Sequence, residues 1–134
     1  MEKEFIGYAE ALALKELGFD EPCFGYYRNY GTNKFYNGIV HNMPRRFRCT
    51  TVPLYQQAFR WFRDKHNLVS IVFNDDGDIE HDNIRYNWEI RVTTYSFKNM
   101  KNEKNACLGN YNYRTYEESE LECLKKLIEI VKNK

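Results

Sequence analysis

The stretch Ile-Arg-Tyr-Asn-Trp-Glu-Ile-Arg-Val-Thr, residues 84–93, alternates apolar and polar side chains without a break. This alternation has the two-residue period of a β-strand that buries one face and exposes the other. Such strands are typical of antiparallel sheets, in which one face packs on the core and the other meets water. Residues 84–93 therefore predict a half-buried antiparallel strand that places Trp88 and Ile90 in the core.

Upstream of this strand, residues 23–30 and 34–40 are rich in aromatic and β-branched side chains, and the sequence Gly31-Thr-Asn33 separates them. Two such runs joined by a short turn predict a β-hairpin. A glycine inside a strand weakens regular pairing, so Gly25 and Gly38 predict bulges.

Three segments have the apolar spacing of helices. The first, residues 8–17, is followed by Gly18, which is suited to a left-handed terminating conformation. The second, residues 51–67, carries Pro53 in its expected first turn. The third follows the sequence Thr115-Tyr-Glu-Glu118, which has the spacing of a capping box.

Further strands are expected over residues 69–73 and 106–113. A chain of 134 residues has the usual size of one domain, so we expect a single α+β domain over residues 1–134. The order of elements favours an antiparallel sheet of about four to five strands with two to three helices packed on one face. The side chains expected in the core are Leu12, Leu17, Phe59, Phe62, Ile71, Trp88, Ile90, Leu124 and Ile128.

Charge is distributed unevenly along the chain, although the formal net charge is only +1. Residues 41–66 carry six Arg and Lys against one acidic residue, whereas residues 74–89 carry six Asp and Glu against one Arg. The basic segment also contains aromatic side chains. The candidate partner-binding residues are therefore Arg45, Arg46, Phe47, Arg48, Arg60 and Arg63.

Three interpretations of this basic face stay open. It fits a protein partner, since complementary charge steers association and the 11 tyrosines supply amphipathic anchors. It fits RNA or DNA, with arginines on phosphates and Phe47 stacked on a base. It also fits a solvated face whose arginines pair with the acidic loop over residues 74–82, and that loop is itself an alternative binding surface.

The sequence contains no recognisable catalytic, phosphate-binding or dinucleotide-binding motif. Its four cysteines lack the paired spacing of a zinc site, so reduced structural thiols are expected. A Cys–His pair that meets only in space, such as Cys49 with His41, is the remaining catalytic alternative. We expect a non-enzymatic protein with no catalytic residue, no metal and no cofactor.

The chain has none of the features expected of a membrane or secreted protein. No run approaches the roughly 20 apolar residues that a membrane span requires. The sequence Met1-Glu-Lys-Glu4 lacks the basic-then-apolar order of a signal peptide. Reduced cysteines are typical of the cytosol, so we expect a cytoplasmic protein without membrane contact.

Residues 10–27, 53–63 and 115–130 resemble a family of small proteins of Bacteroidetes phages and prophages. The three blocks are spread over nearly the whole chain. Residues 28–52 and 69–114 lie between them and do not share the resemblance, and they hold the candidate arginines 45–48 and the acidic segment. It carries over no catalytic or binding residue. It implies a protein of the bacterial host cytoplasm that inhibits or modulates a host protein or ribonucleoprotein, such as an anti-CRISPR inhibitor of a Cas nuclease.

Overall fold

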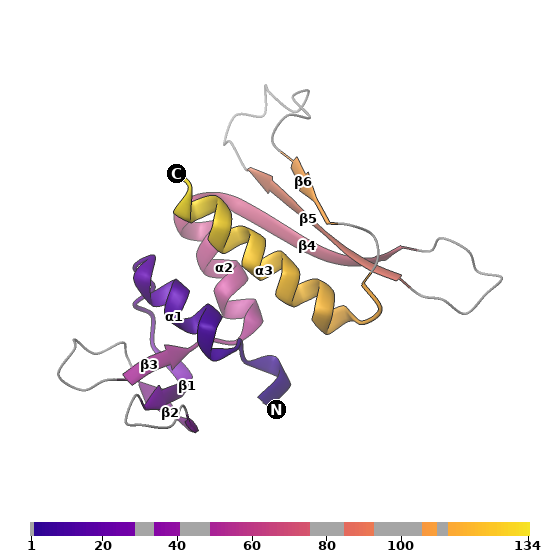
Figure 1. Cartoon of the computed structure of the whole chain (residues 1–134). Coiled ribbons are helices and arrows are strands. Elements are labelled where there is room, and N and C mark those ends of the chain that lie inside the picture. Colours follow the sequence, from indigo (N-terminus) through magenta and orange to yellow (C-terminus); the bar gives the residue numbers. More distant parts are fainter. Residues whose placement is uncertain (1, 29–33, 41–48, 76–84, 93–105, 110–112) are drawn as a thin grey trace. The chain divides into compact units, whose positions relative to one another are not determined.

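The computed structural model describes residues 2–28, 34–40, 49–75, 85–92, 106–109 and 113–134. Within them the chain is α+β, with three α-helices and two antiparallel sheets of three strands each (Figure 1). The expected single sheet of about four to five strands is thus replaced by two smaller sheets. Contacts define two compact units, which are described one at a time: Met1–Ala58 with Ile130–Lys134, and Phe59–Glu129.

The first sheet consists of β1 (Cys23–Arg28), β2 (Lys34–Val40) and β3 (Cys49–Val52), in the order β2-β1-β3. Strands β1 and β2 form the predicted hairpin. Its register shifts between the pairs Cys23–Val40 and Gly25–Asn37, an irregularity at the place where Gly25 and Gly38 predict bulges.

Strand β3 is the main correction to the expected element order. Thr51 and Val52, predicted as the start of a helix, pair instead with Tyr26 and Gly25 of β1. β-Branched side chains suit a strand, and the open edge of β1 supplies the hydrogen-bonding partner. The later strands form a sheet of their own.

Helix α2 (Tyr55–His66) consequently begins later than predicted. Its first hydrogen bond runs from the Ala58 N–H to the Leu54 carbonyl, at 3.0 Å. Pro53 therefore precedes the helix, and its carbonyl accepts a hydrogen bond from the Ile6 N–H at 3.2 Å.

Helix α1 (Tyr8–Glu16) ends as predicted. Gly18 has a φ of +96°, and the N–H groups of Gly18 and Phe19 donate to the carbonyls of Lys15 and Leu14. This pair of bonds is a Schellman motif, which satisfies the last carbonyls of the helix. The buried side chains are Ala11 and Leu14, whereas the predicted Leu12 and Leu17 are only half-buried.

The second sheet consists of β4 (Leu68–Asp75), β5 (Arg85–Val92) and β6 (Ala106–Leu108), in the order β4-β5-β6. Trp88 and Ile90 of β5 are buried, as predicted. The register of β4 places Val72 opposite Trp88 and Ile71 opposite Glu89. Directly opposed residues share a face, so Ile71 lies away from the core and is 46% exposed. Its assignment to the core was wrong.

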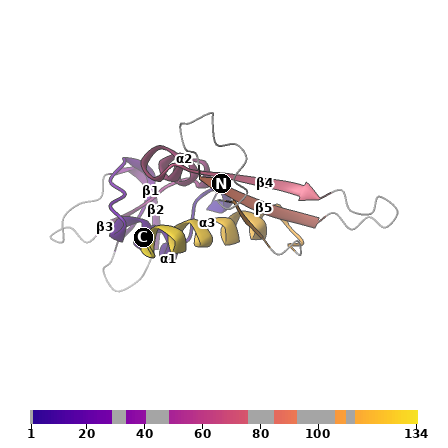
Figure 2. The same cartoon turned by 90° about the horizontal axis from the view of Figure 1, so that it is seen from above.

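Helix α3 (Tyr116–Lys132) begins at the predicted cap. The Glu118 N–H donates to Thr115 Oγ1 at 3.2 Å, while Glu118 Oε2 accepts from the N–H of Arg114, one residue earlier than in a standard capping box. Figures 1 and 2 show α3 running beside the second sheet. Its buried apolar side chains are Cys123, Leu124, Leu127 and Ile128. None of the helices in the described residues is long and apolar enough to cross a bilayer.

Candidate functional site

The hairpin β1–β2 brings two tyrosines together on one side of the first sheet. Tyr26 and Tyr36 are direct partners across the strands. Their rings lie with centroids 5.5 Å apart and planes inclined by only 17°, so they are stacked. Such aromatic pairs contribute about 0.5–1.5 kcal/mol beyond the area that they bury. The stack therefore fixes both rings in a defined orientation.

Two cations lie over this stack. The Arg28 guanidinium carbon is 5.0 Å from the Tyr36 centroid and 5.9 Å from that of Tyr26. The Lys34 ammonium nitrogen is 5.8 Å from the Tyr36 centroid. These distances are in the range of cation–π attraction.

Among the described residues, Arg28 and Lys34 are two positive charges without a carboxylate partner. The two residues are direct partners across the hairpin, an arrangement in which like charges repel. The sequences of β1, β2 and β3 contain no Asp or Glu, and among the described residues neither cation forms an ion pair. Departures of this kind from local pairing rules are expected at functional or strained sites.

Exposed apolar side chains continue the same side of the hairpin. Side chains alternate along a strand, so Phe24 shares its side with Tyr26 and Arg28. Val40 is the direct partner of Cys23, which places Ile39 on the side of Phe24. Phe24 is 61% exposed and Ile39 is 72% exposed. We call this set the hairpin surface: Phe24, Tyr26, Arg28, Lys34, Tyr36 and Ile39.

The other side of the hairpin is packed with aromatic rings. Tyr27 lies 5.2 Å from Tyr8 and 5.7 Å from Phe35, and Phe35 lies 5.0 Å from Phe5, between ring centroids. Gly25 is required beneath these rings, since a Cβ there would lie 2.6 Å from a Phe35 ring carbon. This packing anchors the strands that present the hairpin surface.

The residues predicted as the binding site are only partly described. Arg45, Arg46, Phe47 and Arg48 lie outside the described residues, as does most of the acidic loop 74–82. Arg60 and Arg63 lie exposed on α2, one turn apart. Arg63 Nε is 3.2 Å from Asp64 Oδ1, so part of its charge is met by its neighbour. The basic face remains a prediction.

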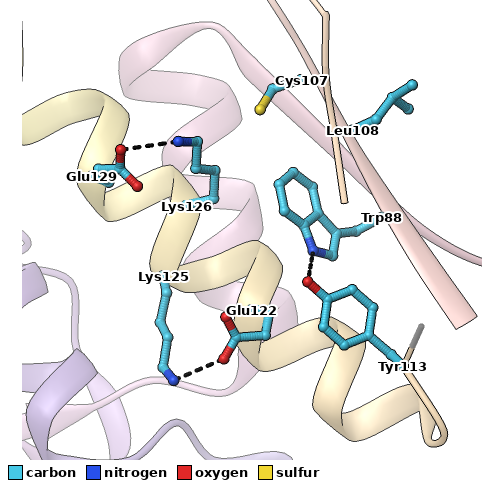
Figure 3. A pocket seen from close by; sticks show the side chains of 8 residues that line it. All are labelled: Trp88, Cys107, Leu108, Tyr113, Glu122, Lys125, Lys126 and Glu129. Atoms are coloured by element: carbon cyan, nitrogen blue, oxygen red, sulfur yellow. Dashed lines mark hydrogen bonds and ion pairs between the residues drawn. The ribbon is translucent and has the colours of Figure 1, made fainter. Parts of the chain in front are cut away.

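A hollow lies in the second unit, between β5, β6 and α3, with a volume of about 290 Å³. In Figure 3, Trp88 and Tyr113 point toward each other, and Trp88 Nε1 donates to Tyr113 Oη at 3.2 Å. The lysines that line it are paired: Lys125 with Glu122 and Lys126 with Glu129, each at 2.9 Å. Because its charges are matched, this hollow has weaker features of a binding site than the hairpin surface.

Metal-binding clusters and reactive thiols were sought among the residues that the structure describes. They contain no group of three or more His, Cys, Asp or Glu side chains able to hold a metal ion. Burial raises the pKa of the Cys23 thiol to about 11 and that of Cys123 to about 12, so both are protonated at neutral pH. A protonated thiol is a poor nucleophile and a poor metal ligand.

Comparison with protein-family models, with curated proteins and with solved structures gave no match. The evidence for the hairpin surface is therefore its geometry. A sequence signal for it exists. From the pair Gly25–Asn37 to the pair Arg28–Lys34, the numbers of opposed positions add to 62, which joins Tyr26 to Tyr36 and Arg28 to Lys34.

Proposed function

We propose that this protein is a non-enzymatic binding protein that holds a host macromolecule, a protein or a ribonucleoprotein, on its hairpin surface. The observation that carries the proposal is the gathering of exposed apolar side chains, stacked tyrosines and unneutralised cations on one side of an anchored hairpin. Aromatic and arginine side chains dominate binding energy at interfaces. Exposed apolar side chains beside them add area to bury.

The resemblance to phage and prophage proteins supports a target in the bacterial host cytoplasm. It suggests inhibition or modulation of that target, with a CRISPR effector nuclease as the class to test first. The sequence-predicted arginines on residues 45–63 are a competing contact surface for the same function. An experiment on the function must therefore separate the two surfaces.

The test is affinity capture of tagged protein from host lysate, with and without nuclease, followed by mass spectrometry. The double variant F24S/I39S removes the exposed apolar pair of the hairpin surface. Its matched control is I71S/L108S, since Ile71 and Leu108 are a second exposed apolar pair, 46% and 49% exposed, on the other sheet. A third variant replaces Arg45, Arg46, Arg48, Arg60 and Arg63 by Ala.

We expect F24S/I39S to lower target recovery at least about tenfold, equivalent to about 1.4 kcal/mol of binding free energy. Recovery with I71S/L108S should equal that with the unchanged protein. Loss only in the five-arginine variant would move the function to the basic face. Full recovery with F24S/I39S would remove the hairpin surface from the proposal.

A further inference from the structure

We infer that the ligand of the hairpin surface is a single-stranded nucleic acid, whether free or as part of a ribonucleoprotein. This inference rests on the proposed function, because it assigns a chemical class to what the same surface holds. Three features of the described residues support it: unpaired positive charge, ring surfaces on neighbouring strands, and the contrast with the second sheet.

The positive charge of the hairpin surface favours an anionic ligand. Arg28 and Lys34 face each other across the strands, and no carboxylate belongs to any of the three strands of this sheet. A phosphate backbone brings a regular row of negative charges, which would relieve the repulsion between the two cations. Lys and Arg contacts to phosphates release counterions and so provide affinity without reading sequence.

The aromatic rings of the hairpin surface favour a ligand with unpaired bases. The Tyr26–Tyr36 stack lies on the central and edge strands of the sheet, and Phe24 continues the same side of β1 with most of its surface exposed. Sheets that bind single strands stack successive bases on aromatic side chains of adjacent strands. Each stacked base contributes to affinity whatever its identity. Bases in a duplex are already stacked on each other, so a single strand is the better fit.

The second sheet carries an exposed apolar pair in a different charge environment. Its exposed apolar residues Ile71 and Leu108 both oppose Glu89. Both carboxylate oxygens of Glu89 bind Arg91, at 2.6 and 3.0 Å. The charge there is internally satisfied, so that face has no comparable attraction for a polyanion. Within the described strands, the aromatic rings and the unmatched cations coincide on the hairpin surface.

The test is a fluorescence anisotropy titration with short labelled oligouridine and oligothymidine, with a duplex of matched length as competitor. The variant R28Q/K34Q removes both cations of the surface and keeps polar side chains of similar length. Its control, K125Q/K126Q, removes the same charge from α3. A further variant, Y36L, removes one ring of the stack while leaving an apolar side chain.

The unchanged protein and K125Q/K126Q should bind both oligonucleotides alike, and the duplex should compete poorly. R28Q/K34Q should bind at least about tenfold more weakly, with a salt dependence reduced by about two phosphate contacts. Circular dichroism confirms that each variant is folded, and K34Q alone replaces the double variant if it is not. Y36L should weaken binding without changing the salt dependence.

Absence of oligonucleotide binding, or equal losses in R28Q/K34Q and K125Q/K126Q, overturns the inference. If a protein target is then still captured through a contact sensitive to F24S/I39S, the proposed function stands and the ligand is a protein surface. If F24S/I39S changes neither capture nor oligonucleotide binding, the proposed function fails as well.

Discussion

Two buried thiols make the free energy of unfolding depend on alkaline pH. Burial raises the pKa of Cys23 to about 11 and that of Cys123 to about 12, from the ordinary value of 9.0. Well below pH 9 both thiols are protonated in the folded and the unfolded chain, so they add no pH dependence there. Above pH 9 the unfolded chain loses these protons while the folded chain keeps them, which favours unfolding.

We therefore predict that the free energy of unfolding falls between pH 9 and about 11–12, by up to about 1.4 kcal/mol per pH unit for each thiol. Urea denaturation at several pH values measures this slope. The variant C23A/C123A, which lacks both groups, should show a smaller slope. Identical slopes in the two proteins would show that these thiols ionise as readily when folded.

At the scale of single residues, the sequence predicted burial correctly where apolar and polar side chains alternate regularly along a strand. It predicted burial incorrectly where the alternation was ambiguous. Trp88 and Ile90 were placed correctly, because alternation in their strand is strict. Ile71 was misplaced, because the run Val-Ser-Ile-Val-Phe over residues 69–73 has apolar side chains at odd and even positions alike, apart from one serine. Only the pairing of Ile71 with Glu89 reveals which face it takes.

At the scale of elements, helix α3 depends on the cap at its start. The Thr115 hydroxyl accepts the Glu118 N–H at 3.2 Å and satisfies one of the donors left open at a helix N-terminus. We predict that T115A lowers the free energy of unfolding by about 1 kcal/mol. Thermal or urea denaturation measures the change. T115S keeps the hydroxyl and should stay near the unchanged protein, and equal losses in both variants would contradict a capping role.

The elements that the sequence predicted are those with local signals. The pairing of β1 with β2, the glycine that ends α1 and the cap of α3 each depend on residues close together in the chain, and the structure confirms all three. Strand β3 has four residues and exists because β1 offers it an edge, a partner more than 20 positions away in sequence. No local pattern contains that information, so the sequence predicted a helix from residue 51, whereas α2 begins at Tyr55.

At the scale of the whole molecule, the sequence predicted the α+β class but not the division of the strands into two sheets. The basic segment was the most visible charge pattern in the sequence, so the predicted site was built on it. The hairpin surface carries two cations, Arg28 and Lys34. Strand pairing places them opposite each other and near the ring of Tyr36, and this arrangement distinguishes the surface. Charge counts along a sequence do not detect such an arrangement.

Hydrogen–deuterium exchange of the free and target-bound protein tests most directly whether the hairpin surface is the contact surface. A bound ligand slows the local opening through which backbone amides exchange. We predict slower exchange in peptides covering residues 23–28 and 34–40 on binding, with no change over residues 116–132. Slower exchange confined to residues 68–75 or 116–132, with the hairpin unchanged, would contradict the proposed function.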